Sequence, residues 1–173
     1  DRTGATLEEI DSAVKFKLGF PMGIFELADF TGMDVIHKAT VEMHLRDKKV
    51  INPHKTVEKM FDEKKLGQKS GEGYYKYSDD KYERVELSEE LAQKCNPIQL
   101  VANVLNNAAW LITNGASDVE EIEKAAKLGL GLRKPLFETA KEIGIQSIVN
   151  ELNELAQEYG EFYKPDPLLE TMI

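Results

Sequence analysis

The chain has 173 residues, which is the length of one large domain or of two small ones. Its residues are 42% apolar and 31% charged, a balance typical of globular proteins rather than of disordered chains. The 22 Lys and Arg residues face 31 Asp and Glu residues, giving a net charge of −9. Because a nucleic-acid surface needs clustered cations, we expect no nucleic-acid partner.

Other features bear on where the protein is found. No apolar run reaches the length of about 18 residues that a membrane span needs, so we expect no membrane partner. Residues 1–5 lack the apolar region of a signal peptide. Cys95 is the single cysteine and cannot form an internal disulfide, which favours a reducing compartment, the cytoplasm.

The chain contains an internal repeat. A shift of 112 positions aligns residues 8–61 with residues 120–173 without a gap, and 16 of the 54 pairs are identical. Composition alone would give roughly 6% identity, so we interpret the repeat as a duplication. The identities include paired glycines and prolines, namely Gly19 with Gly131, Gly32 with Gly144 and Pro53 with Pro165.

Each copy is predicted to be helical. The first helix begins at a capping box of Thr6 and Glu9 and ends at Gly19, and Asp118 is the expected cap in the second copy. A short helix over 23–30 follows in the first copy.

Two more helices are predicted for the first copy. Asp34 is the expected N-cap of the third, and Pro53 is expected to open the fourth. In the fourth helix, Val57, Met60 and Phe61 are expected to point inward.

The segment between the copies has a different character. Residues 74–77, rich in tyrosine, are predicted to be extended, with a turn at 78–81 and a return over 82–87. Residues 97–113 are predicted to form a long buried helix that includes Trp110 and Leu111. The first copy has no counterpart of this helix, and the second copy has no counterpart of residues 66–77. We therefore expect that each copy lacks one element, the first at the N-terminal end of the chain and the second at the C-terminal end.

Candidate chemistry in the residues themselves is sparse. His37 and His44 lie seven residues apart, about 10 Å along a helix, which is too far for one metal ion, so no metal site is expected. We interpret these histidines as structural and His54 as a surface residue at a helix start. Gly71 and Gly73 are followed by tyrosines rather than by a helix start, so they do not form a dinucleotide fingerprint.

Two stretches resemble a known family. Residues 18–34, LGFPMGIFELADFTGMD, resemble the signature of the C-terminal domain of 3-hydroxyacyl-CoA dehydrogenases, and residues 66–77, LGQKSGEGYYKY, resemble the motif that closes that domain. The resemblance covers residues 5–77 closely. Residues 96–173 are similar to the degenerate second copy of multifunctional fatty-acid oxidation enzymes and of archaeal fusions with an enoyl-CoA hydratase.

The resemblance implies an all-α fold of two tandem similar helical domains of the 6-phosphogluconate dehydrogenase C-terminal-like type, with a short extended tyrosine-rich segment between them. Residues 1–78 would be the first domain, without its first helix. Residues 79–95 would be a linker. Residues 96–173 would be the degenerate second copy, without its closing motif.

The resemblance also implies a function. The parent enzyme would oxidise (S)-3-hydroxyacyl-CoA to 3-oxoacyl-CoA in fatty-acid β-oxidation, with NAD bound mainly by a Rossmann domain that precedes this chain. This chain would complete the acyl-CoA cleft and the oligomer interface. The family's catalytic His, Glu and Asn all precede residue 1, so no catalytic residue is expected here and the fragment alone is expected to be inactive. A fused enoyl-CoA hydratase and a homo-oligomer are the further partners that the family brings into consideration.

Four residues match family positions of interest. Lys69 matches a lysine of the closing motif that approaches the bound NAD, and the alternative is a solvated loop lysine. Pro21, Met22 and Phe25 match the turn that faces the acyl-binding cleft, and the alternative is core packing.

Two other functions remain open at this stage. The chain could be a helical assembly module without active-site contact, or the helical half of another β-hydroxyacid dehydrogenase. A glycine-rich strand–helix unit upstream would favour a dehydrogenase, and its absence would favour the module.

Overall fold

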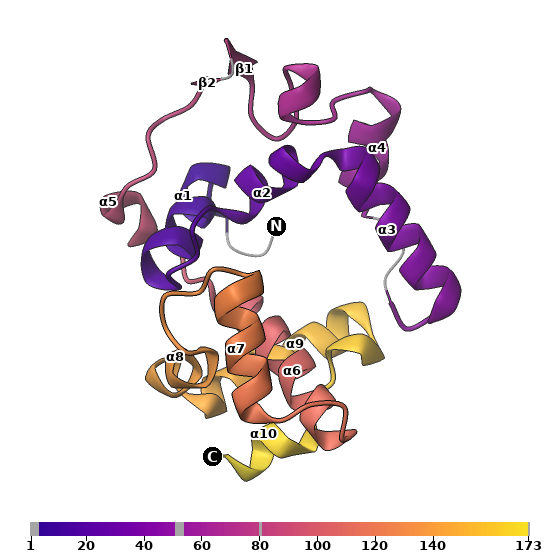
Figure 1. The fold of residues 1–173 in the computed structure, drawn as a ribbon, viewed down its shortest axis with the longest axis vertical. Coiled ribbons are helices and arrows are strands. Elements are labelled where there is room, and N and C mark those ends of the chain that lie inside the picture. The colour runs from indigo at the N-terminus through magenta and orange to yellow at the C-terminus, as the bar shows by residue number, and fades with distance from the viewer. Residues whose placement is uncertain (1–3, 51–53, 80, 173) are drawn as a thin grey trace. The chain divides into compact units, whose positions relative to one another are not determined.

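The computed structural model describes residues 4–50, 54–79 and 81–172, and these ranges are mostly helical, as predicted (Figure 1). The chain divides into two compact units, which we describe separately. The first contains residues up to 14 together with residues 22–95, and the second contains residues 15–21 together with residues 96–173. The division into domains at 78 and 96 stays a prediction.

The first unit contains short helices and one small hairpin. Its elements are α1 (Leu7–Ser12), the start of a π-helical turn η1 (Ala13–Lys17), α2 (Ile24–Thr31), α3 (Met33–Arg46), α4 (Lys55–Asp62), η2 (Gln68–Ser70), β1 (Tyr77–Ser78), β2 (Lys81–Tyr82) and α5 (Glu89–Ala92). The antiparallel strands pair Tyr77 with Tyr82 and Ser78 with Lys81, so the predicted return of the chain is a strand of two residues. The helix α1 packs on α2 and α5, and α3 packs on α2 and α4.

The predicted helix starts are confirmed in part. Thr6 Oγ1 accepts from Glu9 N–H at 3.3 Å, while the Glu9 carboxylate accepts from Thr6 N–H at 3.0 Å, which is the reciprocal capping box. The prediction that Asp34 caps the third helix was wrong, because α3 begins one residue earlier, at Met33. Gly32, with φ of +100°, makes the turn, and Asp34 lies within the first turn of the helix.

The fourth helix begins later than the sequence indicated. His54 is its N-cap and accepts from Thr56 N–H, as an exposed residue at a helix start, while Pro53 lies outside the described residues. Met60 is buried, whereas Val57 and Phe61 are half-buried. His37 stacks on Phe61 with ring centroids 4.4 Å apart.

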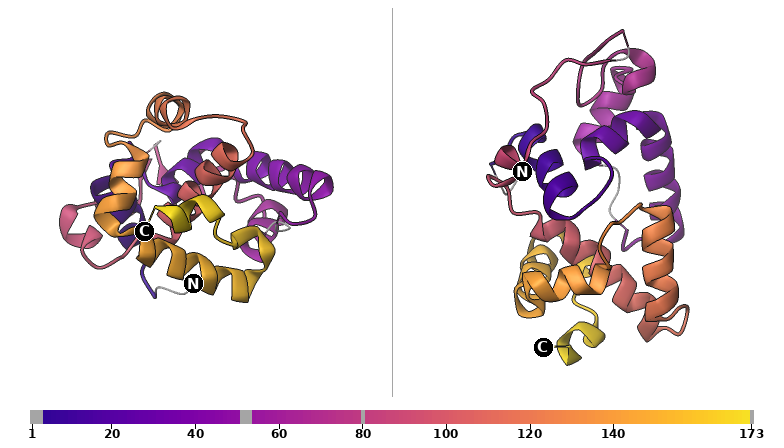
Figure 2. Two further views of the ribbon diagram at one scale, coloured as in Figure 1. Left: turned by 90° about the horizontal axis from the view of Figure 1, so that it is seen from below. Right: turned by 60° about the vertical axis from the view of Figure 1, so that its left-hand side comes forward.

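The second unit is built around α6 (Ile98–Thr113). The other elements are the end of η1, α7 (Val119–Gly129), α8 (Leu136–Ile143), α9 (Ile145–Tyr159), η3 (Glu161–Tyr163) and α10 (Pro167–Thr171). The helix α6 packs against α8, α9 and α10, and Figure 2 shows these elements from two further directions. Asp118 accepts from Glu121 N–H at 2.9 Å, which confirms it as the cap of α7.

Two residues of α6 differ from expectation. Trp110 and Leu111 were predicted to be buried, but their exposed fractions are 56% and 37%. The buried face of α6 instead includes Asn106, whose amide donates to Lys164 O at 2.8 Å and accepts from Asp166 N–H at 2.7 Å. A polar side chain is stable there because the irregular backbone after η3 satisfies both of its groups.

The two copies differ in how completely their helices are covered. In the second copy, Leu155 of α9 is 6% exposed, whereas its counterpart in the first copy, Met43 of α3, is 54% exposed. Thr139 of α8 is buried, whereas its counterpart Leu27 of α2 is 47% exposed. The helices α8 and α9 of the second copy both pack on α6. Among the described residues, no helix combines the length and apolar character needed to cross a membrane.

Candidate functional site

A buried carboxylate holds the start of α2. The side chain of Asp11, at the end of α1, accepts from Phe25 N–H at 2.9 Å and from Glu26 N–H at 3.0 Å. These are first-turn amides that have no partner within the helix. Glu26 in turn reaches back and accepts from Gly23 N–H at 2.8 Å. Two acidic groups therefore satisfy the N-terminus of the helix that carries the family signature.

A second buried carboxylate, that of Asp29, holds the closing motif, residues 66–77, against α2. Asp29 is 1% exposed and accepts from Tyr74 N–H and Tyr75 N–H, both at 2.8 Å, and from the Tyr77 hydroxyl at 2.9 Å. Three donors aimed at one carboxylate satisfy its hydrogen-bonding capacity in the interior. The two motifs recognised in the sequence therefore form one structural feature.

Tyr75 connects the two carboxylates. Its backbone N–H donates to Asp29, and its buried phenol donates to Asp11 at 2.9 Å. Burial raises the pKa of the Asp11 carboxyl above its usual value, and this effect exceeds the opposing effect of the donors at Phe25, Tyr75 and Glu26. Burial, with the nearby Asp11 charge, also raises the pKa of Tyr75, so the phenol stays protonated and remains a donor.

Three glycines of the two motifs lie close against the buried carboxylate residues. A Cβ at Gly73 would lie 2.1 Å from Asp29 Oδ1, and a Cβ at Gly67 would lie 2.2 Å from Asp29 O. In the signature, a Cβ at Gly23 would lie 2.1 Å from Asp11 Cγ. Each contact is far inside van der Waals distance, so these three positions require glycine for close packing around the carboxylates.

An arginine that follows the hairpin contacts both α2 and the closing motif. Arg84 forms an ion pair with Glu26, and both side chains are almost fully buried. Its guanidinium carbon lies 5.0 Å from the ring centroid of Tyr75 and 4.3 Å from that of Tyr82. A planar cation between two rings suits Arg rather than Lys, because guanidinium can stack and pair at once.

Lys69 lies at the exposed edge of this arrangement. It belongs to η2, and its ammonium pairs with the Asp34 carboxylate in the first turn of α3. The exposed fractions of the two side chains are 46% and 28%. The hydrogen bond from Lys69 lowers the pKa of the Asp34 carboxyl. A cation is therefore presented to solvent at a fixed point beside the turn between α2 and α3.

The three residues expected to face an acyl chain lie in different surroundings. Phe25 is half-buried and packs on Tyr74 of the closing motif, with ring centroids 4.6 Å apart. Met22 is half-buried in the same unit. Pro21 is exposed and belongs to the second unit, where its ring lies next to Gly131. Their predicted role in substrate binding is not tested by these positions.

The second copy retains only part of this arrangement. Glu123 accepts from Leu136 N–H at 2.7 Å and from Phe137 N–H at 2.9 Å, so it holds the start of α8 as Asp11 holds the start of α2. Glu123 is the counterpart of Asp11 in the repeat alignment. Lys141 is the counterpart of Asp29, so the second copy lacks the carboxylate that binds the closing motif.

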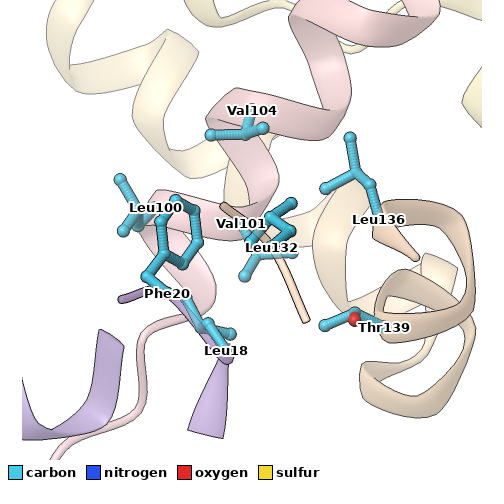
Figure 3. A pocket seen from close by; sticks show the side chains of 8 residues that line it. All are labelled: Leu18, Phe20, Leu100, Val101, Val104, Leu132, Leu136 and Thr139. Atoms are coloured by element: carbon cyan, nitrogen blue, oxygen red, sulfur yellow. The ribbon is translucent and has the colours of Figure 1, made fainter. Parts of the chain in front are cut away.

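The second unit also contains an apolar pocket, drawn in Figure 3. The side chains of Leu18 and Phe20 reach it from the segment before α2, and those of α6 and of the α7–α8 region complete it. Thr139 is the polar residue of the lining, and its hydroxyl donates to Pro135 O at 3.0 Å. The lining offers hydrophobic contact but no charged group.

Sequence reasoning missed the buried acids. Asp29 lies among the apolar residues of α2, whereas Asp11 lies in the mixed sequence of α1, and Glu123 occupies the repeat position of Asp11. An acidic residue on a predicted buried stripe is the available signal, since a buried carboxylate requires donors nearby. The sequence does not say that those donors are the backbone of α2 and of the closing motif.

Comparison with known proteins gives the family context. The family model described as "3-hydroxyacyl-CoA dehydrogenase, C-terminal domain" matches residues 2–77 and again residues 99–173. A protein named hydroxyacyl-coenzyme A dehydrogenase, mitochondrial, from Rattus norvegicus is 39% identical over 79 residues, covering 44% of this chain and 25% of its own length. A fatty acid oxidation complex subunit alpha from Idiomarina loihiensis is 28% identical, covering 98% of this chain and 26% of its own length. The chain thus spans about a quarter of these relatives.

Solved structures share the fold. A 3-hydroxybutyryl-CoA dehydrogenase from Escherichia coli K12 matches with a TM-score of 0.74 at 20% identity, covering 99% of this chain and 55% of that chain. The dehydrogenase part of multifunctional enzyme 1 from C. elegans matches with a TM-score of 0.63 at 24% identity, covering 97% of this chain and 42% of that one.

Both copies of the repeat therefore match one and the same domain, and the closing motif that Asp29 anchors lies within the first match. The chain belongs to the 3-hydroxyacyl-CoA dehydrogenase C-terminal domain family.

Proposed function

We propose that this chain is the C-terminal part of an NAD-dependent dehydrogenase that converts (S)-3-hydroxyacyl-CoA to 3-oxoacyl-CoA in fatty-acid β-oxidation. The observation that carries the proposal is the double match to the family domain, together with a closing motif in which the N–H groups of Tyr74 and Tyr75 donate to Asp29 and Gly67 and Gly73 pack closely against it. The likeness of the chain to the fatty acid oxidation subunit over 98% of its length supports a multifunctional parent. A fused enoyl-CoA hydratase is the partner domain proposed on that ground.

The cofactor proposed is NAD, held mainly by a Rossmann domain outside this chain. NAD, when bound, supplies the acceptor for the hydride that leaves the substrate's hydroxyl-bearing carbon. The exposed ammonium of Lys69 fits an anionic group of such a cofactor, because it is a cation on a loop whose backbone is fixed. No residue of this chain is proposed to take the substrate's hydroxyl proton.

Pro21, Met22 and Phe25 are proposed to contact the acyl chain. Half-buried Met22 and Phe25 offer an adaptable thioether and a ring beside the closing motif.

The second copy is proposed to be structural and to support a homo-oligomer, because it keeps the scaffold around Glu123 but has Lys141 where the first copy has Asp29. For the compartment we propose the reducing cytoplasm, on the ground that the chain has a single cysteine, Cys95, which cannot form an internal disulfide.

The test is a spectrophotometric assay of the full-length protein that contains this chain, following oxidation of NADH by acetoacetyl-CoA. Turnover by the full-length protein, with none by residues 1–173 alone, is the expected result. Absence of turnover in a folded full-length protein would refute the acyl-CoA assignment. The other dehydrogenase class or the assembly module would then be the better explanation.

The role of Lys69 has its own test in the same assay. Lys69→Met keeps the aliphatic stem and removes the charge, so it should raise the KM for NADH while leaving the KM for acetoacetyl-CoA unchanged. Unchanged kinetics would identify Lys69 as a solvated loop residue.

A further inference from the structure

The position of Lys69 is fixed from both ends of its side chain. On the backbone side, the loop that carries it is closed by a hydrogen bond of 2.8 Å from Leu66 N–H to Ser70 Oγ. At the other end, the ammonium lies over Gly32, where a Cβ would approach Lys69 Nζ to 2.5 Å. The absence of a side chain at Gly32 leaves the space that the lysine occupies.

Asp34 is the partner of the ammonium. In the described part of the chain, the structure gives Lys69 Nζ no other ion pair or hydrogen bond. An ammonium has three donors, so one serves Asp34 and two remain for an anion. Both side chains are partly exposed, and exposed ion pairs contribute little to stability. The contact therefore matters chiefly for where the charge is placed.

The repeat shows that Asp34 is not needed to build the turn. In the second copy, Gly144 has φ of +97°, close to the +100° of Gly32, and α9 begins directly after it as α3 does after Gly32. The counterpart of Asp34 there is Gln146. The same turn thus forms without the carboxylate in the copy whose described residues include no closing-motif lysine.

We propose that Asp34 is a positioning residue for Lys69, holding its ammonium beside the α2–α3 turn with its remaining donors directed to a phosphate of the dinucleotide cofactor. The inference rests on the proposed role of Lys69 in the full-length dehydrogenase. It assigns to Asp34 an effect on cofactor affinity that is transmitted entirely through Lys69.

The test is a double-mutant cycle in the full-length protein, with Asp34→Asn, Lys69→Met and the double variant. The Kd for NADH, measured by fluorescence titration, is the primary readout, and the KM for NAD and kcat are measured alongside. Asp34→Asn should weaken NADH binding about threefold to tenfold, the size of one ordinary hydrogen bond lost at a partly exposed site, and leave kcat within about twofold. In the Lys69→Met background, Asp34→Asn should cause no further change in the Kd for NADH. Asp34→Glu, which keeps the carboxylate, should restore most of the affinity.

A matched control is available in the closing motif itself. Glu72 pairs with Lys65 at 3.0 Å, with exposed fractions of 40% and 39%, so Glu72→Gln removes an equally exposed ion pair and the same charge. It should leave the Kd for NADH unchanged. Equal effects of Glu72→Gln and Asp34→Asn would show a general charge effect and overturn the inference.

Four other outcomes would also count against the inference. Tighter NADH binding by Asp34→Asn would make Asp34 a competitor of the cofactor rather than a positioning residue. An undiminished effect of Asp34→Asn in the Lys69→Met background would show that Asp34 acts by another route. If Lys69→Met alone has no effect on the Kd for NADH, the proposed role of Lys69 fails and the inference fails with it. If Lys69→Met weakens binding and Asp34→Asn does not, only the inference about Asp34 fails.

Discussion

Replacing Asp29 by alanine is expected to release the closing motif from α2. The wild-type carboxylate is 1% exposed and accepts three hydrogen bonds of 2.8–2.9 Å. Each hydrogen bond to a charged group contributes about 1.5–3 kcal/mol. The hydroxyl of half-buried Tyr77 can turn to water in the variant, but the N–H groups of Tyr74 and Tyr75 lose their partner. We therefore expect the free energy of unfolding of the first unit to fall by about 3–5 kcal/mol.

The assay uses urea unfolding with two probes that separate the units. Trp110 is the only tryptophan and lies in the second unit, so its fluorescence follows that unit, whereas far-ultraviolet circular dichroism follows both. Hydrogen exchange of the peptide 66–77 reports the closing motif directly, with a peptide from α8 for comparison. The matched control is Asp62→Ala, at the exposed end of α4, which should change stability by less than about 0.5 kcal/mol.

Asp29→Ala must accelerate hydrogen exchange in residues 66–77 and lower the circular dichroism midpoint. If protection of that peptide is the same as in the wild type, and the loss of stability is below about 1 kcal/mol, the closing motif is held by something other than Asp29. A loss of the same size from Asp62→Ala would equally contradict the assignment.

Three other variants test related contacts. Glu123→Ala should lower the midpoint of the Trp110 fluorescence transition by an amount equivalent to about 2–4 kcal/mol, because it strips two amide partners, and an unchanged midpoint would contradict its capping role. Gly73→Ala should cost more than about 2 kcal/mol in urea unfolding because its Cβ would collide with the Asp29 carboxylate, whereas Gly129→Ala, which points into open space, should be neutral or stabilising. Burial raises the pKa of Asp11 above 3.8, so the folded state holds this proton more tightly than the unfolded state does. The free energy of unfolding of the wild type should therefore fall relative to that of Asp11→Asn as the pH rises from about 4. Urea midpoints that rise with pH for the wild type relative to Asp11→Asn would refute this prediction.

The sequence was informative where local rules decide the structure. The capping box of Thr6 and Glu9 and the cap at Asp118 were predicted correctly because a cap depends on residues within one turn. The long helix over 98–113 was predicted from its apolar run and is present as α6. The family resemblance was confirmed by the domain match to both copies.

Long-range contacts account for the rest. Trp110 looked like a core residue because nearly every face of α6 is apolar, and the sequence alone does not say which face the partners cover. Asp34 looked like a cap, yet the turn is made by Gly32 and the carboxylate pairs with a lysine 35 positions later. The anchoring role of Asp29 depends on residues 45–48 positions away, beyond the reach of any local pattern.

The position of Tyr75 has a consequence for how the first unit folds. Its hydroxyl contact with Asp11 closes a loop of 64 residues, and its backbone contact with Asp29 closes one of 46. In the second unit, Glu123 reaches its amides after only 13 and 14 residues. Contacts between distant residues form slowly, because the entropy of the intervening chain must be lost first. During synthesis, α1 and α2 leave the ribosome before any donor to the Asp29 side chain exists, and while Asp11 still lacks its partner Tyr75. The first unit can complete its interior only when the tyrosines of residues 74–77 have been made.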